Sequence, residues 1–168
     1  MNRPQPNEYP NWGGQYIDLV EEEDVLLVLE RQALEFPEFL DNFIEKADYA
    51  YAPGKWTIKE LVGHIIDTER ILCFRLLSFA RGENSDLPGF EEDDYVKVAH
   101  FAERSLLSFG EEFSMLRKAN LYLFKSLNEA DLNRGGLASS RYMTVRALLF
   151  IIAGHVIHHT RIIKERYA

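Results

Sequence analysis

The segment TVRALLFIIAGHVIHHTRIIKERY, residues 144–167, has the pattern of one long helix with polar residues inside its apolar face. Thr144 is a favourable N-cap, and a helix from Val145 to Tyr167 would be roughly 34 Å long. Apolar positions recur with the 4-3-4-3 spacing of a buried stripe, in the order Leu148, Ile152, His155, His159, Ile162. Two histidines therefore stand where the pattern calls for leucine or isoleucine. A buried imidazole needs a polar partner, so this pair is the first candidate for chemistry.

Three earlier segments show the same helical periodicity. The first runs from about Ile17 to Lys46, where Pro37 predicts a kink or break near Phe36. The second begins at Thr57, whose spacing from Glu60 is that of a capping box, and ends near Gly82. The third runs from about Ala99 or Ser105 to Leu127.

Turn-rich joints separate these segments, and they cover residues 49–56, 83–95 and 128–142. Strand signals are weak throughout, because β-branched runs are short and do not alternate with polar residues. Four amphipathic helices of similar length predict an all-α fold, a four-helix bundle. We expect one domain over residues 1–168, in which the proline-rich residues 1–16 form an irregular N-terminal arm.

Composition and charge exclude several classes of protein. Cys73 is the only cysteine, so neither an intrachain disulfide nor a thiolate metal cluster can form. The N-terminus does not resemble a signal peptide, and the apolar run from Ala147 to Gly154 is far shorter than the roughly 20 residues of a membrane span. We predict a cytoplasmic protein that binds no membrane. The net charge of −8 argues against nucleic-acid binding, because it repels phosphate backbones.

His155 and His159 are spaced i,i+4, which places both imidazoles on one helix face within reach of a single metal ion. His158 could replace His159 as the second ligand of this helix, although the helix face that carries His158 turns toward the flank of the bundle. The third ligand should come from another helix, and His64 in the second segment is the candidate. His100 follows an acidic loop and is expected to be exposed.

Two glycines and a carboxylate accompany the candidate ligands. Gly63 and Gly154 directly precede His64 and His155, and we expect them to make room for close helix approach. Asp67 lies three residues after His64 and is the candidate proton acceptor or hydrogen-bond partner of an imidazole. Glu60 and Glu69 lie on the same helix, and we interpret them as a cap and a solvated charge. Arg70 and Arg75 are candidate ion-pair partners of these acids.

A set of three neutral histidines leaves coordination positions open for water or substrate. Structural zinc sites are usually closed by four protein ligands, so three histidines favour a catalytic metal. Such a metal could activate water or bind a thiol as thiolate, and the number of ligands does not choose between these reactions.

Three segments together resemble the DinB/YfiT-like family of four-helix metalloproteins. They are Pro53–Glu69, the loop Leu87–Tyr95, and Gly154–His159, and their order and separation also fit. The resemblance extends from about residue 20 to the end of the chain. It implies a bundle in which one histidine from the second helix and an HxxxH pair from the fourth bind zinc or nickel, which here are His64, His155 and His159. It also implies a homodimer.

Characterised members of that family include thiol transferases and isomerases that use a low-molecular-weight thiol such as bacillithiol or mycothiol. The leading functional hypothesis is therefore a metal-dependent enzyme that transfers a small thiol to a small-molecule electrophile. The first alternative is a metal-dependent hydrolase of a small substrate. The second is a non-catalytic dimeric bundle in which the metal is structural or absent.

Overall fold

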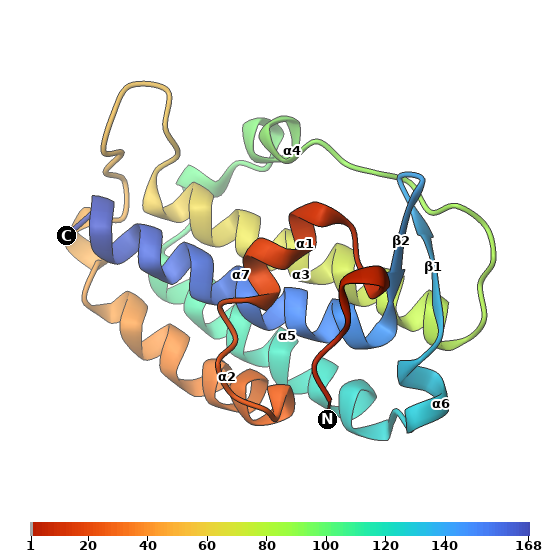
Figure 1. Cartoon of the computed structure of the whole chain (residues 1–168). Coiled ribbons are helices and arrows are strands. Elements are labelled where there is room, and N and C mark those ends of the chain that lie inside the picture. Colours follow the sequence, from red (N-terminus) through yellow and green to blue (C-terminus); the bar gives the residue numbers. More distant parts are fainter. Residues whose placement is uncertain (1) are drawn as a thin grey trace.

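The computed structural model describes residues 2–168. Its four long helices lie alongside one another and confirm the predicted four-helix bundle (Figure 1). These helices are α2 (Val25–Asp41), α3 (Ile58–Ala80), α5 (Leu106–Ser126) and α7 (Val145–Arg166). Shorter elements cover the ends and one side of the bundle: η1 (Pro6–Glu8), α1 (Asn11–Ile17), η2 (Ile44–Lys46), α4 (Glu92–Val98), η3 (Phe101–Glu103), α6 (Glu129–Leu132), β1 (Gly135–Ala138) and β2 (Arg141–Thr144).

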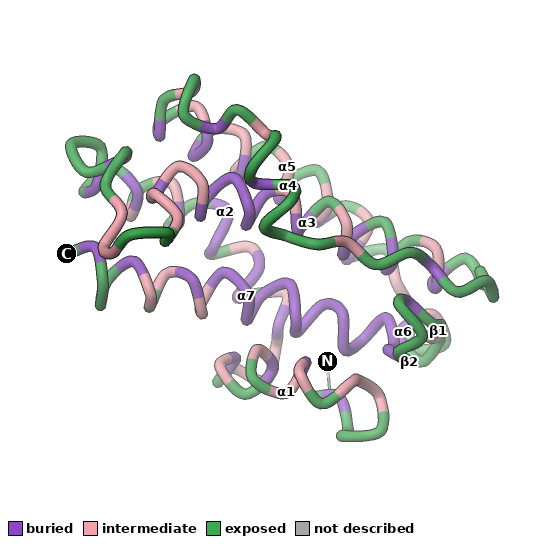
Figure 2. Tube along the Cα trace, turned by 90° about the horizontal axis from the view of Figure 1, so that it is seen from above, coloured by how far each residue is buried: buried purple, intermediate pink, exposed green. Residues whose placement is uncertain are grey.

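Helix α7 is the core helix of the bundle. It packs against α1, α2 and α3, and residues 145–156 are buried without interruption (Figure 2). Its length and hydropathy would also suit a membrane span, a property shared by core helices of soluble proteins, and 67% of its apolar window is buried within the protein. His155 lies within this buried run, and His159, which is also buried, follows it by one helical turn.

The predicted helix caps are confirmed. The Thr57 hydroxyl accepts a hydrogen bond from the Glu60 backbone N–H at 3.2 Å, and the Glu60 carboxylate accepts one from the Thr57 N–H at 2.7 Å. The Thr144 hydroxyl likewise accepts from the Ala147 N–H at 3.1 Å. Gly82 follows the end of α3 with a φ of +84°, a left-handed conformation that glycine adopts without strain. These caps fix where α3 and α7 start, and hence where their histidines lie.

The N-terminal part of the chain differs from the prediction. Residues 1–16 were expected to be irregular, but helix α1 begins at Asn11 and packs on α7, and the long helix α2 begins only at Val25. A seven-residue helix is too short to show periodicity in sequence, and the contact with α7 stabilises it. The close approach depends on Gly154, where an added Cβ would lie 2.0 Å from the carbonyl oxygen of Tyr16.

Helix α2 continues through Pro37 to Asp41 instead of breaking near Phe36. A proline at this position removes the N–H that would bond to the carbonyl of Ala33. The Ser114 hydroxyl of α5 donates to that carbonyl at 2.8 Å, so the group left without its helical partner is satisfied by the neighbouring helix.

The joints also contain structure that the sequence did not indicate. Residues 128–142 contain α6 and most of an antiparallel hairpin in which Gly135 pairs with Thr144. Its turn residues Ser139 and Ser140 have φ values of 54° and 57°. The expected loop over residues 83–95 joins this hairpin through Leu87, whose N–H donates to the Leu137 carbonyl at 2.9 Å, and then enters α4. Four-residue strands are too short to give a sequence signal.

A layer of buried polar side chains separates two apolar clusters, one toward the hairpin and one toward the C-terminus. Glu69 belongs to this layer and is only 3% exposed, so its interpretation as a solvated charge was wrong. Both of its carboxylate oxygens accept hydrogen bonds from the Arg117 guanidinium at 2.8 Å. Arg117 also donates to Gln32 at 2.6 Å, and Gln32 donates to the Ala153 carbonyl at 2.8 Å. This network fixes α7 two residues before His155.

Candidate metal centre

The three predicted ligands, His64 of α3 and His155 and His159 of α7, meet inside the bundle. The Nε2 atom of His155 lies 3.2 Å from Nε2 of His64 and 3.0 Å from Nε2 of His159. Each ring contributes one nitrogen to the cluster, and these three nitrogens all lie within 4.8 Å of one another. All three side chains are buried, with residue exposures of 8%, 5% and 8%.

These distances fit a shared metal ion. Two nitrogens bound to one zinc-sized ion at 2.0–2.1 Å and tetrahedral angles lie about 3.3–3.4 Å apart. A hydrogen-bonded cluster explains the arrangement less well, because the single proton that Nε2 of His155 can carry satisfies one of its two nitrogen neighbours. A divalent cation bound by His64, His155 and His159 would accept a lone pair from each of the three rings. The Thr68 hydroxyl, 3.4 Å from Nδ1 of His64, lies where it can orient that ring.

Burial keeps the three imidazoles neutral, which is the protonation state that a metal ligand requires. It lowers the pKa of His64 to about 4, against the opposing effect of the Glu92 and Asp93 carboxylates. Burial, reinforced by the neighbouring histidines, lowers the pKa of His159 to about 3 and that of His155 well below its ordinary value. At neutral pH the site therefore presents three uncharged nitrogen donors.

Aromatic rings pack against the cluster, and His158 lies beside one of them, outside the cluster. The Trp56 ring lies with its centroid 4.8 Å from that of His64. The Tyr16 ring makes edge contacts with His155 and His158, each at 5.4 Å between centroids. His158 is half-buried beside Tyr16 and lies outside the group of converging ligand atoms. His159 is therefore the second α7 residue of the cluster.

A cavity of about 360 Å³ adjoins the histidines, a size suited to a small molecule. His64 and His155 form part of its wall, so an open coordination position on a bound ion would be reached from it. The remaining wall comes from α1, α3, the loop after α3, the start of α4, the hairpin and α7. Its polar members besides the histidines are Gln15, Tyr16, Thr68, Arg75, Glu92, Ser139 and Arg141.

A sequence profile of the DinB superfamily matches residues 29–163, most of the chain and all three histidines. The chain belongs to the DinB superfamily. The fold also matches a solved structure, that of YfiT from Bacillus subtilis, with a TM-score of 0.70, 18% sequence identity, and coverage of 98% of this chain and 91% of that one. YfiT has an unusual four-helix bundle topology, and a metal-dependent hydrolase activity has been inferred for it. No curated protein sequence matches this chain.

Asp67 is the predicted catalytic carboxylate. In this DinB-superfamily protein its side chain faces away from the histidine cluster. Its nearest ionic partner is the Arg70 guanidinium at 3.6 Å, and Arg70 also pairs with Glu112. Asp67 is absent from the cavity wall, and none of the hydrogen bonds within residues 2–168 joins it to a histidine. Asp67 is three residues from His64, and this spacing puts it on the neighbouring face of α3. That face meets α5 instead of α7.

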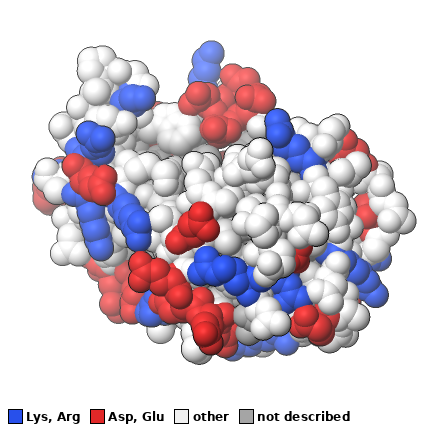
Figure 3. Space-filling model, in the orientation of Figure 1, with Lys and Arg blue, Asp and Glu red and all other residues white. Residues whose placement is uncertain are grey.

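Glu92 is the carboxylate that the structure places in the cavity wall of this DinB-superfamily protein. Its charge opposes the lowering of the His64 pKa by burial, and it adds to the effect of burial that raises the pKa of Tyr16. It belongs to the acidic group Glu91, Glu92, Asp93 and Asp94 at the start of α4, and Figure 3 shows acidic side chains gathered over that helix. The acidic run is visible in sequence, but only the folding of α4 over α3 shows which of its members reaches the cavity.

The expected close helix approach is found at Gly154, whereas Gly63 makes room for an aromatic side chain. A Cβ on Gly63 would lie 2.5 Å from the Phe101 ring of η3, and Gly154 accommodates the backbone of α1. His100 is exposed, which confirms that prediction. Arg75 pairs with no acid within residues 2–168 and instead donates to the Pro88 carbonyl at 2.9 Å.

Proposed function

We propose that this protein is a divalent-metal-dependent enzyme that acts on a small molecule bound in the 360 Å³ cavity. The observation that carries the proposal is the convergence of three buried, neutral imidazoles of which two line that cavity. His64, His155 and His159 would hold zinc or nickel. Because three protein ligands leave a coordination position open, this donor set suits catalysis better than a structural role.

The bound ion would lower the pKa of a thiol or a water molecule and so supply a nucleophile at neutral pH. Glu92 is the proposed acceptor of the proton that the nucleophile loses, because it is the carboxylate in the cavity wall and its charge acts on His64. Tyr16 and Trp56 pack against the imidazoles of His155 and His64 and would help to hold them in place.

Transfer of a low-molecular-weight thiol is the leading reaction, as the resemblance to thiol-transferring relatives predicts. The thiol loses its proton to Glu92, its sulfur forms a bond to an electrophilic carbon, and the leaving group departs with its electron pair and takes up a proton. Sulfur is a suitable donor to zinc or nickel, which accept soft ligands. A thiol of the bacillithiol or mycothiol type is the proposed cosubstrate.

Hydrolysis is the second candidate, and the likeness to YfiT favours it. The same residues would serve, with water in place of the thiol and an ester, amide or similar bond as the target. Glu92 would again accept the proton.

Two measurements test the proposal. Elemental analysis of protein purified without a histidine tag should show about one zinc or nickel ion per chain, and His64→Ala, His155→Ala and His159→Ala should each lose it. Turnover of an electrophile panel should then be compared with and without added bacillithiol or mycothiol. Turnover that requires the thiol supports transfer, and turnover that ignores it supports hydrolysis. Unchanged metal content in all three variants, or no turnover by the metal-loaded protein, would overturn the assignment as an enzyme.

A further inference from the structure

Arg75 of α3 is a buried cation without a counter-charge. Its residue is 6% exposed, and no carboxylate within residues 2–168 forms an ion pair with it. One guanidinium nitrogen, Nη2, donates to the Pro88 carbonyl at 2.9 Å, and the buried Nε has no hydrogen-bond partner. Burial of a guanidinium without an anionic partner costs free energy, so the position needs a reason beyond packing.

The other buried arginines show what a balanced site looks like in this protein. Arg117 is paired through two hydrogen bonds with Glu69, and Arg146 donates to Glu129 at 2.5 Å and lies 3.6 Å from Glu8. Each of these guanidinium groups has a carboxylate beside it. Arg75 is the exception among the buried arginines in residues 2–168, and it is the one that lines the cavity.

Arg75 lies on the same strip of α3 as His64. The residues of α3 that line the cavity, His64, Thr68, Leu72 and Arg75, have the 4-4-3 spacing of one helix face. The Cα atoms of His64 and Arg75 are about 16 Å apart along the helix, so the cavity wall runs from the histidine cluster to the guanidinium. A single small molecule in this cavity can thus contact both.

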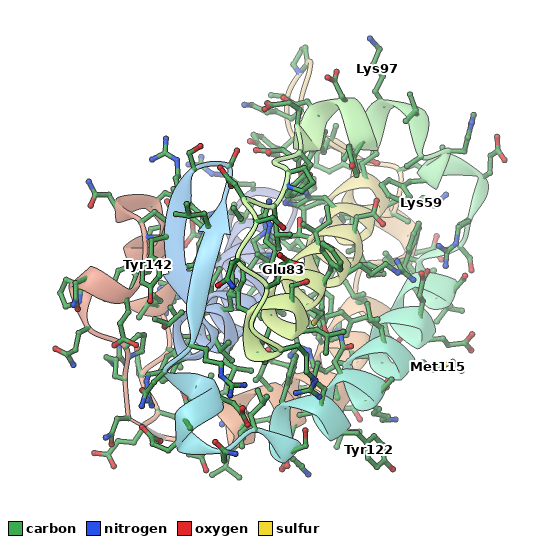
Figure 4. The ribbon with its side chains drawn as sticks, turned by 90° about the vertical axis from the view of Figure 1, so that its right-hand side faces the viewer. Lys59, Glu83, Lys97, Met115, Tyr122 and Tyr142 are labelled. Atoms are coloured by element: carbon green, nitrogen blue, oxygen red, sulfur yellow. The ribbon has the colours of Figure 1, made fainter. Side chains whose placement is uncertain are left out.

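The hairpin and the loop after α3 form the wall near Arg75. Figure 4 shows them side by side, with Tyr142 on the hairpin and Glu83 at the start of the loop. Leu87 joins the hairpin by backbone hydrogen bonds to Leu137 and Ser139, each at 2.9 Å, and Pro88 is the residue that holds Arg75. This connection fixes the guanidinium position relative to the cavity.

The charges that line the cavity are unevenly placed. Glu92 is the only carboxylate in the wall formed by the described residues, and its effects on His64 and Tyr16 place it at the histidine end. Arg75 and the exposed Arg141 are its two arginines. In a chain of net charge −8, this cavity therefore carries one more positive than negative side chain.

We propose that Arg75 binds an acid group, a carboxylate, on the molecule that occupies the cavity, while the opposite end of that molecule reaches the metal held by His64, His155 and His159. This inference rests on the proposed function and adds the substrate class: a small molecule with one anionic end. A carboxylate matches the single uncompensated charge and the planar donor arrangement of a guanidinium.

The test compares an acid with its uncharged counterpart. Binding of 6-mercaptohexanoate and 6-mercaptohexanamide to the zinc-loaded protein should be measured by calorimetry, and binding of hexanoate and hexanamide to the protein after metal removal. We expect each acid to bind about tenfold or more tightly than its amide, because a charge-assisted hydrogen bond is gained. Arg75→Met should abolish this preference, Arg75→Lys should keep part of it, and the control Arg70→Met, outside this cavity, should leave it unchanged.

Equal binding of acid and amide by the wild-type protein would overturn the inference, and this comparison needs no folded variant. A preference that survives in folded Arg75→Met would also overturn it. Failure of the proposed function is a separate result: the protein would bind no metal, while the metal-free preference of hexanoate over hexanamide would still report on Arg75. The same comparison should be made with phosphonate analogues. If Arg75 increases the binding affinity of phosphonates by a larger factor than that of carboxylates, the assignment of a carboxylate is wrong.

Discussion

The Nε2 atoms of His64 and His155 lie 3.2 Å apart, although the two residues are 91 positions apart in the chain. Their contact is made by two helices that begin at side-chain caps, Thr57 for α3 and Thr144 for α7. The buried network of Arg117, Glu69 and Gln32 then fixes α2, α3, α5 and α7 relative to one another beside the cluster. The position of the histidines is thus determined by the whole bundle.

Loss of any one cluster histidine should remove the metal. His64→Ala, His155→Ala and His159→Ala should each weaken zinc binding by more than about 100-fold, which exceeds the effect of losing a residue that only hydrogen-bonds to a ligand. His158→Ala is the matched control, since it alters an adjacent histidine of the same helix outside the cluster. Zinc titration with a competing chelator measures the change. Equal losses in the control and the three variants would contradict the assignment.

Stability of the metal-free protein should fall with acidification. The pKa of His64 is about 4 and that of His159 about 3 in the folded chain, whereas an unfolded histidine titrates near 6.5. Below about pH 6.5 the unfolded state therefore binds protons that the folded state does not, and the free energy of unfolding decreases until the folded groups titrate. His64 alone contributes a loss of about 3 kcal/mol between pH 7 and pH 4.

Urea unfolding at a series of pH values measures this loss. His159→Phe should make the profile less steep, because one of the three buried imidazoles is then absent. A flat profile between pH 7 and pH 5 would show that the imidazoles are not neutral and buried.

Replacement of Glu92 should separate catalysis from metal binding. Glu92→Gln removes the proposed proton acceptor and should lower kcat by about 10²–10⁴-fold, with metal content unchanged. Asp93→Asn is the matched control, because Asp93 also acts on His64 but lies outside the cavity wall. Asp67→Asn tests the carboxylate that the sequence predicted. A larger loss of turnover in Asp67→Asn than in Glu92→Gln would restore Asp67 as the proton acceptor.

The buried Glu69–Arg117 pair should have a large effect on folding when one partner is lost. Glu69→Ala leaves the Arg117 guanidinium buried and unpaired, so the free energy of unfolding should fall by about 3–5 kcal/mol. Lys125→Ala, which breaks the exposed pair with Glu30, should cost less than about 1 kcal/mol. Urea denaturation of both variants gives the comparison, and similar losses in the two would show that Arg117 finds another partner.

Gly154→Ala tests the contact between α1 and α7. An added Cβ would meet the Tyr16 carbonyl oxygen at 2.0 Å, so α1 must move, at a cost of about 1–3 kcal/mol. At Gly14 the nearest atom to an added Cβ is a Tyr9 ring atom at 3.6 Å, and Gly14→Ala should be neutral or slightly stabilising. The two melting temperatures check this. If Gly154→Ala melts like the wild type, α1 does not depend on close backbone packing.

Features with a local physical cause were predictable from sequence. The capping box at Thr57, the N-cap at Thr144 and the glycine stop at Gly82 depend on residues within one helical turn, and the structure contains all three. The i,i+4 spacing of His155 and His159 likewise follows from helix geometry, as does their position on the buried stripe. A helix through Pro37 was not predictable, because its missing hydrogen bond is compensated by Ser114 of another helix.

The sequence by itself determined four long helices, the capped starts of α3 and α7, and the histidine faces that a bundle would bury. Only the tertiary structure decided which charges those faces meet: it buried Glu69 against Arg117, turned Asp67 toward Arg70, and placed Glu92 and Arg75 in the cavity wall. The physical reason is the distance along the chain between the residues that interact. Caps and periodicity arise from contacts within a few residues, whereas the partner of a charged side chain depends on which helices pack together.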